Sequence, residues 1–274
     1  MNVVLLAAGL GSRLGTLTRD LPKALIPVAG KPLLLHALAF AARLRPSRII
    51  VVGGFCFPQV KDTLATFLAN DKAAALPSRV GVAGLCPAEP ERGPSQGFPS
   101  IELVENTQFR DGNLVSLLTA RPLISEGFLV MNVDHIYRPG IADVVAPEVS
   151  AVTAFIDTDR KLGSDDMKVE RGAGGRQDRI VAIAKTLTKF DCGYVGMTRV
   201  PTTLLGRYFE EAERALAEEG RAIHVERILD RLAKTDFAPT CRDISGHGWL
   251  EVDTPDERAA AEAALDADAS GCWA

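Results

Sequence analysis

Residues 5–32 read LLAAGLGSRLGTLTRDLPKALIPVAGKP, and this stretch decides the fold. The chain enters it through an apolar run at residues 3–6, which predicts a buried strand. The run opens into a loop of small residues that includes Gly9, Gly11 and Ser12. Such a loop can point successive main-chain N–H groups at one place, and the resulting concavity binds phosphate. The stretch therefore predicts a strand followed by a phosphate-binding loop.

Two basic residues follow the loop. Arg13 offers a planar fork of donors, and Lys23, directly after a proline, offers a point charge, so both suit a polyphosphate. The P-loop pattern is absent, because no Lys-Ser or Lys-Thr pair follows a glycine at the required spacing. The dinucleotide-binding pattern also fails, because Gly15 comes one residue too late to be its third glycine. The alternative is a glycine-rich turn that carries surface charges.

Composition and charge exclude several classes of protein. With 274 residues, 47% of them hydrophobic, the chain can bury a large α/β core. A net charge of -4 argues against nucleic acid or an anionic membrane surface as the main partner. No apolar run reaches a membrane-spanning length, so we expect a cytoplasmic protein without membrane insertion. The scattered cysteines lack a C-x-x-C spacing and predict thiols rather than a zinc site.

Apolar and amphipathic segments alternate through the first part of the chain. Residues 33–44 predict a helix, residues 49–53 a second buried strand, and residues 58–69 another helix. This alternation predicts right-handed βαβ units and a parallel sheet, with ligand loops at the carboxyl ends of the strands. Residues 84–100, rich in proline and glycine, predict a loop that is either a lid or an ordinary surface excursion.

A polar turn separates the next predicted strand from the helix that follows it. Residues 101–105 predict a strand, Asn106 follows it, and residues 114–121 predict a helix. Gly112, just before that helix, permits close approach of the main chain to a nucleobase or ribose. The alternative for this segment is an ordinary turn and helix cap.

Two aspartates stand at the ends of predicted strands. Residues 128–131 form an apolar run that leads to Asp134 and His135. A carboxylate at the end of a central strand, in a chain with a phosphate loop, is a candidate Mg²⁺ ligand. His135 either binds substrate or is a partly buried histidine with a structural role. Asp253, after a strand at residues 249–252, is either a capping carboxylate or a second metal ligand opposite Asp134.

The chain becomes rich in short strands after residue 150. Four strands are predicted, at residues 151–156, 167–170, 179–184 and 192–197. Lys168 and Lys185 lie in or beside these strands, where a long cationic side chain either reaches a phosphate or stays solvated.

Helices are expected near the end of the chain. Residues 202–219 and 222–233 predict two amphipathic helices that serve the structure or a homodimer interface. Thr254 is expected to cap a last helix, with Pro255 at its first position and Glu257 completing a capping box.

The loop and its basic residues resemble a known signature. The nucleotidyltransferases that make NDP-sugars and CDP-alcohols carry A-A-G-x-G-[ST]-R-[LM] followed by P-K-[AP]-L. Other stretches resemble inositol-1-phosphate cytidylyltransferases, among them GNLVSLL at residues 112–118, VMNVDHIY at 130–137 and WLEVDTP at 249–255. The resemblance extends over residues 2–265. The sequence departs from that family at Asn132 and Val133, where the family has Ser, and in a shorter turn before Asp191.

The resemblance implies a fold and a reaction. The fold is α/β and Rossmann-like, with a mixed, mostly parallel central sheet flanked by helices and a small β-rich acceptor-binding lobe. Residues 1–274 form one domain, in which residues 1–150 bind mainly nucleotide and residues 151–265 mainly acceptor. The reaction is Mg²⁺-dependent transfer of CMP from CTP to an alcohol phosphate, first of all inositol 1-phosphate, which gives CDP-inositol and pyrophosphate.

Three alternatives stand beside this reaction. One is a cytidylyltransferase for phosphocholine or a phosphonate, and another is a sugar-1-phosphate nucleotidyltransferase that uses another NTP. The third is a catalytically silent nucleotide-sensing subunit. The partners implied are CTP and a small phosphorylated alcohol, with no nucleic acid.

The resemblance also assigns roles to residues. Arg13 and Lys23 are expected to be catalytic, and Asp134 and Asp253 to hold Mg²⁺. The nucleotide-binding residues expected are Leu6, Ala7, Ala8, Gly9, Gly11, Ser12, Asn106, Gly112 and Asn113. The acceptor-binding residues expected are His135, Lys168, Lys185, Asp191 and Gly193.

Overall fold

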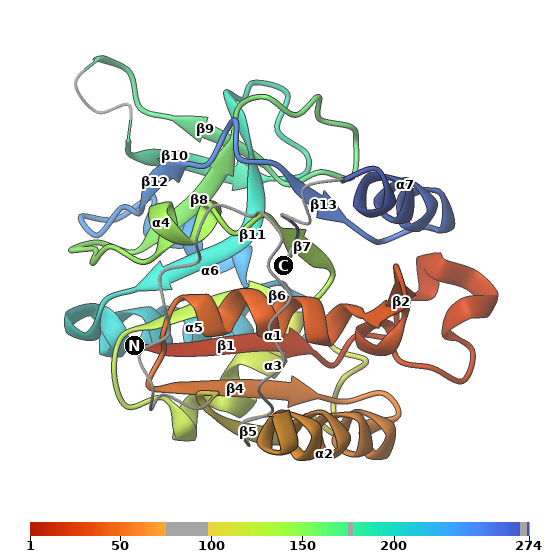
Figure 1. Ribbon diagram of the computed structural model, residues 1–274. Helices are drawn as coiled ribbons and strands as arrows, with labels where there is room; N and C mark the ends of the chain where they lie inside the picture. The colour runs from red at the N-terminus through yellow and green to blue at the C-terminus, as the bar shows by residue number, and fades with distance from the viewer. Residues whose placement is uncertain (75–97, 175–177, 269–272, 274) are drawn as a thin grey trace.

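The computed structural model describes residues 1–74, 98–174, 178–268 and 273. Within them, a nine-stranded sheet runs in the order β10-β9-β11-β6-β1-β4-β5, with β8 paired to β11 and β12 paired to β8 (Figure 1). The strands are β1 (Asn2–Ala7), β4 (Arg48–Gly53), β5 (Ser100–Glu105), β6 (Phe128–Asn132), β8 (Thr153–Asp157), β9 (Lys168–Arg171), β10 (Ile180–Ala184), β11 (Cys192–Val200) and β12 (Thr240–Asp243).

The first half of the chain forms the parallel part of this sheet. β1 pairs in parallel with β4 on one side and β6 on the other, and β5 continues beyond β4. All residues of β1 are buried, as expected for a central strand with both faces covered. The βαβ arrangement expected from the alternating segments is therefore confirmed.

The second half of the chain extends the same sheet. β11 runs antiparallel to β6, and it also pairs antiparallel with β8 and β9. The expected short strands are present. The acceptor half predicted at residues 151–265 is thus continuous with the parallel strands through β11, and its strands lie in the upper part of Figure 1.

Helices cover the sheet and bury its two faces. They are α1 (Leu33–Arg43), α2 (Phe57–Ala74), α3 (Asn113–Ala120), α4 (Ile141–Val145), α5 (Leu205–Glu219), α6 (Glu226–Leu232) and α7 (Pro255–Asp266). Successive strand residues point to opposite faces, so Leu5 joins the cluster under α1 while Leu6 joins the cluster under α3, α5 and α6. Both clusters are fully apolar at their centres, which fixes the sheet between them.

Two small two-stranded sheets accompany the central sheet. β13 (Trp249–Glu251) pairs antiparallel with β7 (His135–Tyr137), which directly follows the end of β6. The main-chain N–H of Val252 donates to the carbonyl oxygen of Asp134 at 2.9 Å. This pairing brings Asp253 beside Asp134, although the two are far apart in the sequence. β2 (Pro27–Val28) pairs with β3 (Lys31–Pro32).

One predicted helix is shorter than expected, and there is a physical reason. The segment 222–233 becomes helical only at Glu226, because residues before it bond to the start of α3. The N–H of Gly112 donates to the carbonyl oxygen of Arg221 at 2.7 Å, and the N–H of Val225 donates to Oδ1 of Asn113 at 2.8 Å. These bonds take up main-chain groups that a longer helix would need.

Some expectations concern residues or properties that the structure addresses only in part. The predicted loop at 84–100 lies, up to residue 97, outside the described residues. In the described part of the chain, no helix is both long and apolar enough to cross a bilayer. No disulfide joins the cysteines at described positions, Cys56, Cys192 and Cys241.

Candidate active site

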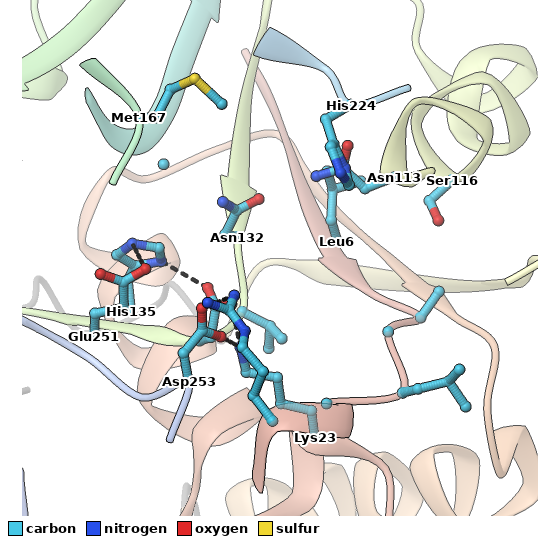
Figure 2. A pocket seen from close by; sticks show the side chains of 18 of the residues that line it. Leu6, Lys23, Asn113, Ser116, Asn132, His135, Met167, His224, Glu251 and Asp253 are labelled. Atoms are coloured by element: carbon cyan, nitrogen blue, oxygen red, sulfur yellow. Dashed lines mark hydrogen bonds and ion pairs between the residues drawn. The ribbon is translucent and has the colours of Figure 1, made fainter. Parts of the chain in front are cut away.

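A cleft of about 480 Å³ opens at the carboxyl ends of the parallel strands. Its floor is made by the loop after β1 and by Lys23, and the ends of β6 and β13 form one wall. Figure 2 shows Lys23 and Asp253 meeting at the floor, with His135 and Glu251 to one side and Asn113, Ser116 and His224 to the other. A cleft at this position is where α/β sheets of this kind bind ligands.

Gly11 gives the phosphate loop its shape. Its φ of 67° lies in the left-handed region, which residues with a side chain rarely adopt. A Cβ atom at this position would lie 2.8 Å from Cβ of Lys23, too close for the loop to keep its path. The glycine therefore lets the loop pass directly over Lys23, and the 3₁₀ helix η1 (Ser12–Thr18) begins immediately after it.

Lys23 joins the two aspartates of the site. It begins the 3₁₀ helix η2 (Lys23–Leu25), is 8% exposed, and donates from Nζ to Oδ2 of Asp134 at 2.5 Å. The same Nζ donates to Oδ1 of Asp253. Burial pushes the pKa of Asp134 upward, but the Lys23 ammonium and His135 outweigh it and hold that pKa well below its usual value. Asp134 is therefore ionised throughout the physiological pH range.

Arg13 connects the phosphate loop to the opposite wall. Its guanidinium donates to Oδ2 of Asp253 and to Oδ2 of Asp165, and its side chain is 49% exposed. Asp253 directly precedes Thr254, the cap of α7. The expected capping box is present, and Glu257 accepts from the main-chain N–H groups of Asp253 and Thr254 at 2.8 and 3.0 Å. The cap fixes the position of Asp253.

The two aspartates have the donors that a hard divalent cation prefers. Their carboxylates face each other, and the ammonium group of Lys23 lies between them and contacts both. No group of three or more His, Cys, Asp or Glu side chains in the described residues has the geometry of a metal site. Mg²⁺ is commonly held by one or two carboxylates together with substrate phosphates and water. The residues present fit that mode of binding.

His135 is held rigidly against the metal-site candidate Asp134. It is 4% exposed and stacks on Trp249 and Tyr137, with ring centroids 5.1 and 5.8 Å apart. Its Nδ1 lies 2.7 Å from Oδ1 of Asp134, and its Nε2 lies 3.9 Å from Oε1 of Glu251. Burial lowers its pKa, but the two carboxylates outweigh this and raise it. The histidine lines the cleft and also orients Asp134.

The structure brings most of the expected site residues together. The cleft is lined by Leu6, Ala8, Gly9, Gly11, Ser12, Arg13, Lys23, Asn113, Asp134, His135, Lys185 and Asp253. Six expected residues do not line it, namely Ala7, Asn106, Gly112, Lys168, Asp191 and Gly193.

Two of the six help to build the cleft from behind. A Cβ atom at Gly112 would lie 1.8 Å from the carbonyl oxygen of Ile223, so the close approach of these two main chains requires a glycine. Asn106 is 2% exposed and donates to Oγ of Ser116 at 3.0 Å. Ser116 lines the cleft, so Asn106 lies behind the cleft surface and orients the Ser116 hydroxyl.

Lys168, Asp191 and Gly193 also lie behind the cleft surface. Lys168 is 7% exposed, and its Nζ donates to the carbonyl oxygen of Lys185 at 2.8 Å. Asp191 accepts from the N–H of Arg171 at 2.7 Å. A Cβ atom at Gly193 would lie 2.7 Å from Cδ2 of Leu162. Lys185, by contrast, lines the cleft and donates to Oδ1 of Asp165 at 2.9 Å.

The sequence reasoning missed several residues of the cleft. Among them are Asp165, Asp166, Tyr194, Glu226 and Glu251. Asp165 and Asp166 lie in a bend of the chain and Glu226 begins a helix, where charged residues are usually solvated. Tyr194 lies in strand β11 and Glu251 in strand β13, whose facing surfaces the sequence did not reveal. Asn132 also lines the cleft, which places the departure from the inositol family motif at the site itself.

Comparisons with known proteins agree with this geometry. The family model of the MobA-like NTP transferase domain matches residues 3–235. A CMP-5'-(3-aminopropyl)phosphonate synthase of Streptomyces rubellomurinus is 27% identical over 274 residues, covering 96% of this chain and 38% of that protein. The bifunctional IPC transferase and DIPP synthase of Aquifex aeolicus is 26% identical over 260 residues, covering 93% of this chain and 50% of that protein. The chain thus spans half or less of the length of these relatives.

A solved structure shows the same fold. The inositol-1-phosphate CTP transferase from T. maritima superposes with a TM-score of 0.70 at 19% identity, covering 93% of this chain and 90% of that chain. The expected Rossmann-like nucleotidyltransferase fold, with its mixed, mostly parallel sheet, is therefore confirmed.

Proposed function

The chain belongs to the MobA-like NTP transferase domain family and is a nucleotidyltransferase, and from this premise we propose that it transfers CMP from CTP to a small acceptor that carries a phosphate or phosphonate group. An oxygen of that group forms a bond to the α-phosphorus of CTP. The bond from this phosphorus to the oxygen that bridges to the β-phosphorus breaks, and pyrophosphate leaves with the electron pair. The observation that carries the proposal is the meeting of Lys23 with Asp134 and Asp253 beneath the glycine loop.

The chemistry requires alignment and charge compensation more than proton transfer. A phosphate monoester has its second pKa near 6, so it is largely a dianion at neutral pH and needs no general base. Two anions must instead be held in line for attack. We assign the triphosphate to the main-chain N–H groups of the loop from Gly9 to Ser12 and to Arg13. Lys23, which is buried below the loop, compensates the charge that develops around the α-phosphate.

Asp134 and Asp253 would hold Mg²⁺ in this reaction. A bound Mg²⁺ would supply positive charge to the phosphates that undergo the reaction. Asp134 is ionised, and both aspartates are held in position, Asp134 by His135 and Asp253 by the cap of α7. The ion pairs of Lys23 and Arg13 with these carboxylates keep the anionic site neutralised before ligands arrive.

Two classes of acceptor are compatible with the proposal. Inositol 1-phosphate follows from the motifs of the chain, and the T. maritima enzyme with the same fold is an inositol-1-phosphate CTP transferase. An aminoalkylphosphonate is the second class, because one relative that covers 96% of the chain is a CMP-5'-(3-aminopropyl)phosphonate synthase. Both acceptors present the same anionic oxygen to the α-phosphorus, so the chemistry proposed at Lys23 is common to both.

The test is a pyrophosphate-release screen of ATP, CTP, GTP and UTP against both acceptor classes, phosphocholine and common sugar 1-phosphates. We expect release that depends on CTP and Mg²⁺. Nucleotide binding is measured separately by thermal shift, where a ligand at 100 times its dissociation constant adds about 2.7 kcal/mol to stability. A preference for another NTP would refute the choice of CTP, and nucleotide binding without turnover of any acceptor would favour a silent sensing subunit.

A further inference from the structure

Glu226 places a buried carboxylate in the wall of the cleft without a cation beside it. It is the first residue of α6, lines the cleft, and is only 7% exposed. Among the described residues it forms no ion pair, and the N–H that reaches its carboxylate is that of its own main chain. Burying an anion without a partner is costly, so such groups are normally paired or bind a ligand.

Every other carboxylate that lines the described cleft has a partner from elsewhere in the chain. Those partners are Arg221 for Asp111, Lys23 for Asp134 and Asp253, Arg13 and Lys185 for Asp165, Arg160 for Asp166 and Glu251, and the N–H groups of Asp253 and Thr254 for Glu257. Glu226 and Glu257 both lack a cation, but Glu257 accepts from two main-chain N–H groups of the α7 cap, so Glu226 is the one carboxylate of the described cleft without a partner from another residue.

The surroundings of Glu226 do not supply the missing charge. His224 and Lys185 act on it electrostatically, but neither is paired with it, and Nζ of Lys185 donates to Asp165. Burial raises the pKa of the Glu226 carboxyl above its ordinary value and exceeds the effect of these two residues. The phenol oxygen of Tyr208, in the apolar core near Glu226, is also buried and has no hydrogen-bond partner among the described residues, so the core beside Glu226 is short of polar partners.

The charge of Glu226 favours the acceptor over the nucleotide. α6 packs on β10, which Lys185 directly follows, while the N–H of Val225 donates to Asn113 at the start of α3, so Glu226 stands where these two parts of the cleft meet. Its carboxylate acts electrostatically on Tyr194, which belongs to β11 and also lines the cleft. The loop proposed for the triphosphate comes from the first half of the chain. An unpaired carboxylate would also repel a triphosphate, so it suits a part of the substrate that is not anionic.

We propose that Glu226 binds a positively charged nitrogen of the acceptor, so that the acceptor is an amine that carries a phosphate or phosphonate at its other end. This inference rests on the proposed function and selects between its two acceptor classes. The ammonium group of the acceptor forms an ion pair with the buried Glu226 carboxylate. The anionic end of the same acceptor faces Lys23 and the α-phosphate. An acceptor that lacks the cation leaves the carboxylate buried and unpaired.

The experiment compares a charged acceptor with its uncharged isostere. 2-Aminoethylphosphonate and propylphosphonate differ in having an ammonium or a methyl group at the same position. Pyrophosphate release with CTP and Mg²⁺ gives kcat/KM for each, with phosphocholine and inositol 1-phosphate measured in parallel. We expect the wild-type chain to prefer 2-aminoethylphosphonate over propylphosphonate by about 30-fold or more, as for other buried charge pairs.

Variants assign that preference to one side chain. Glu226→Gln should bring the ratio for the two phosphonates close to one by raising KM for the charged acceptor, with KM for CTP unchanged. Glu226→Asp should keep part of the preference. Glu213→Gln is the matched control, because Glu213 is a glutamate of α5 that lies outside the cleft and pairs with Arg121 on the surface. Thermal denaturation of each variant reports whether the fold is kept.

The outcomes separate this inference from the proposed function. Turnover of inositol 1-phosphate or propylphosphonate as fast as that of both amines would overturn the role of Glu226 and leave cytidylyl transfer intact. A rise in KM for CTP alone in Glu226→Gln would place the carboxylate against the nucleotide and overturn the inference as well. Failure of all four acceptors would refute the proposed function together with this inference.

Discussion

Replacing Lys23 by Met removes the one cation among the described residues that touches both aspartates of the site. Asp134 and Asp253 contact the same nitrogen atom, so the variant leaves two carboxylates facing each other across the space of a single ammonium. Two like charges about 4 Å apart repel by about 4 kcal/mol at an effective dielectric constant of 20. This agrees with the roughly 3–5 kcal/mol lost when one partner of a buried pair is removed.

The loss should be visible as a drop in melting temperature that a divalent cation reverses. For a chain of this size, 1 kcal/mol corresponds to roughly 2–4 °C, so we expect Lys23→Met to melt about 10 °C lower in EDTA. Excess MgCl₂ should restore much of this difference, because Mg²⁺ then compensates the two carboxylates. Pyrophosphate release should fall by at least roughly 100-fold even with MgCl₂, since the charge near the α-phosphate is lost.

A matched control makes the result specific to the site. Lys189 also pairs with a carboxylate, that of Glu170, but its side chain is 85% exposed, so Lys189→Met should change neither melting nor activity measurably. If Lys23→Met melts at the wild-type temperature in EDTA, the two aspartates do not depend on Lys23, and the reasoning from the ion pairs is refuted.

Three further predictions test other parts of the account. Asp253→Asn should abolish the Mg²⁺-dependent thermal shift and lower pyrophosphate release by roughly 100-fold or more, whereas an unchanged Mg²⁺ shift would remove Asp253 from the metal site. Gly112→Ala should destabilise the chain by more than about 3 kcal/mol, because its Cβ would lie 1.8 Å from the carbonyl oxygen of Ile223; a normal melting temperature would contradict this. Burial raises the pKa of Cys192 to about 12, so iodoacetamide at pH 8 should leave it unmodified in the native chain while Cys56, which is partly exposed, reacts, as read by mass spectrometry. The pKa of Cys192 is higher in the folded chain than its value near 9 in the unfolded chain, so the free energy of unfolding should decline as pH rises from 9 towards 12. A free energy of unfolding that does not change over this pH range would argue against the shift.

Much of the fold could be predicted from the sequence because local signals and burial agree. The buried strands β1 and β4 consist mainly of apolar runs, and the residue types at Thr254, Pro255 and Glu257 indicate the N-terminal cap of α7. The pairing of β13 with β7 could not be read in the same way. It joins segments more than 100 residues apart, and only that pairing brings Asp253 beside Asp134.

The positions of site residues could be predicted where only one residue type can satisfy the local geometry or charge. They were harder to predict where the same residue type commonly has several structural roles. Gly11 and Lys23 lie at the floor of the cleft. The left-handed backbone conformation there requires a glycine, and the two facing carboxylates require a cation. Gly112 and Lys168 were expected to bind ligands; in the structure Gly112 packs against the main chain of Ile223, and Lys168 donates to the carbonyl oxygen of Lys185. Glu226 gave no signal, because a glutamate that begins a helix is usually solvated and only the packing of α6 buries it.

The most direct test of the central claim is a crystal structure of the chain with CTP and Mn²⁺, with the metal located from its anomalous scattering. We expect one Mn²⁺ peak within coordination distance of both Asp134 and Asp253, with the triphosphate on the loop from Gly9 to Arg13 and Lys23 turned towards the α-phosphate. A peak bound by neither aspartate, or a triphosphate seated away from that loop, would contradict the account.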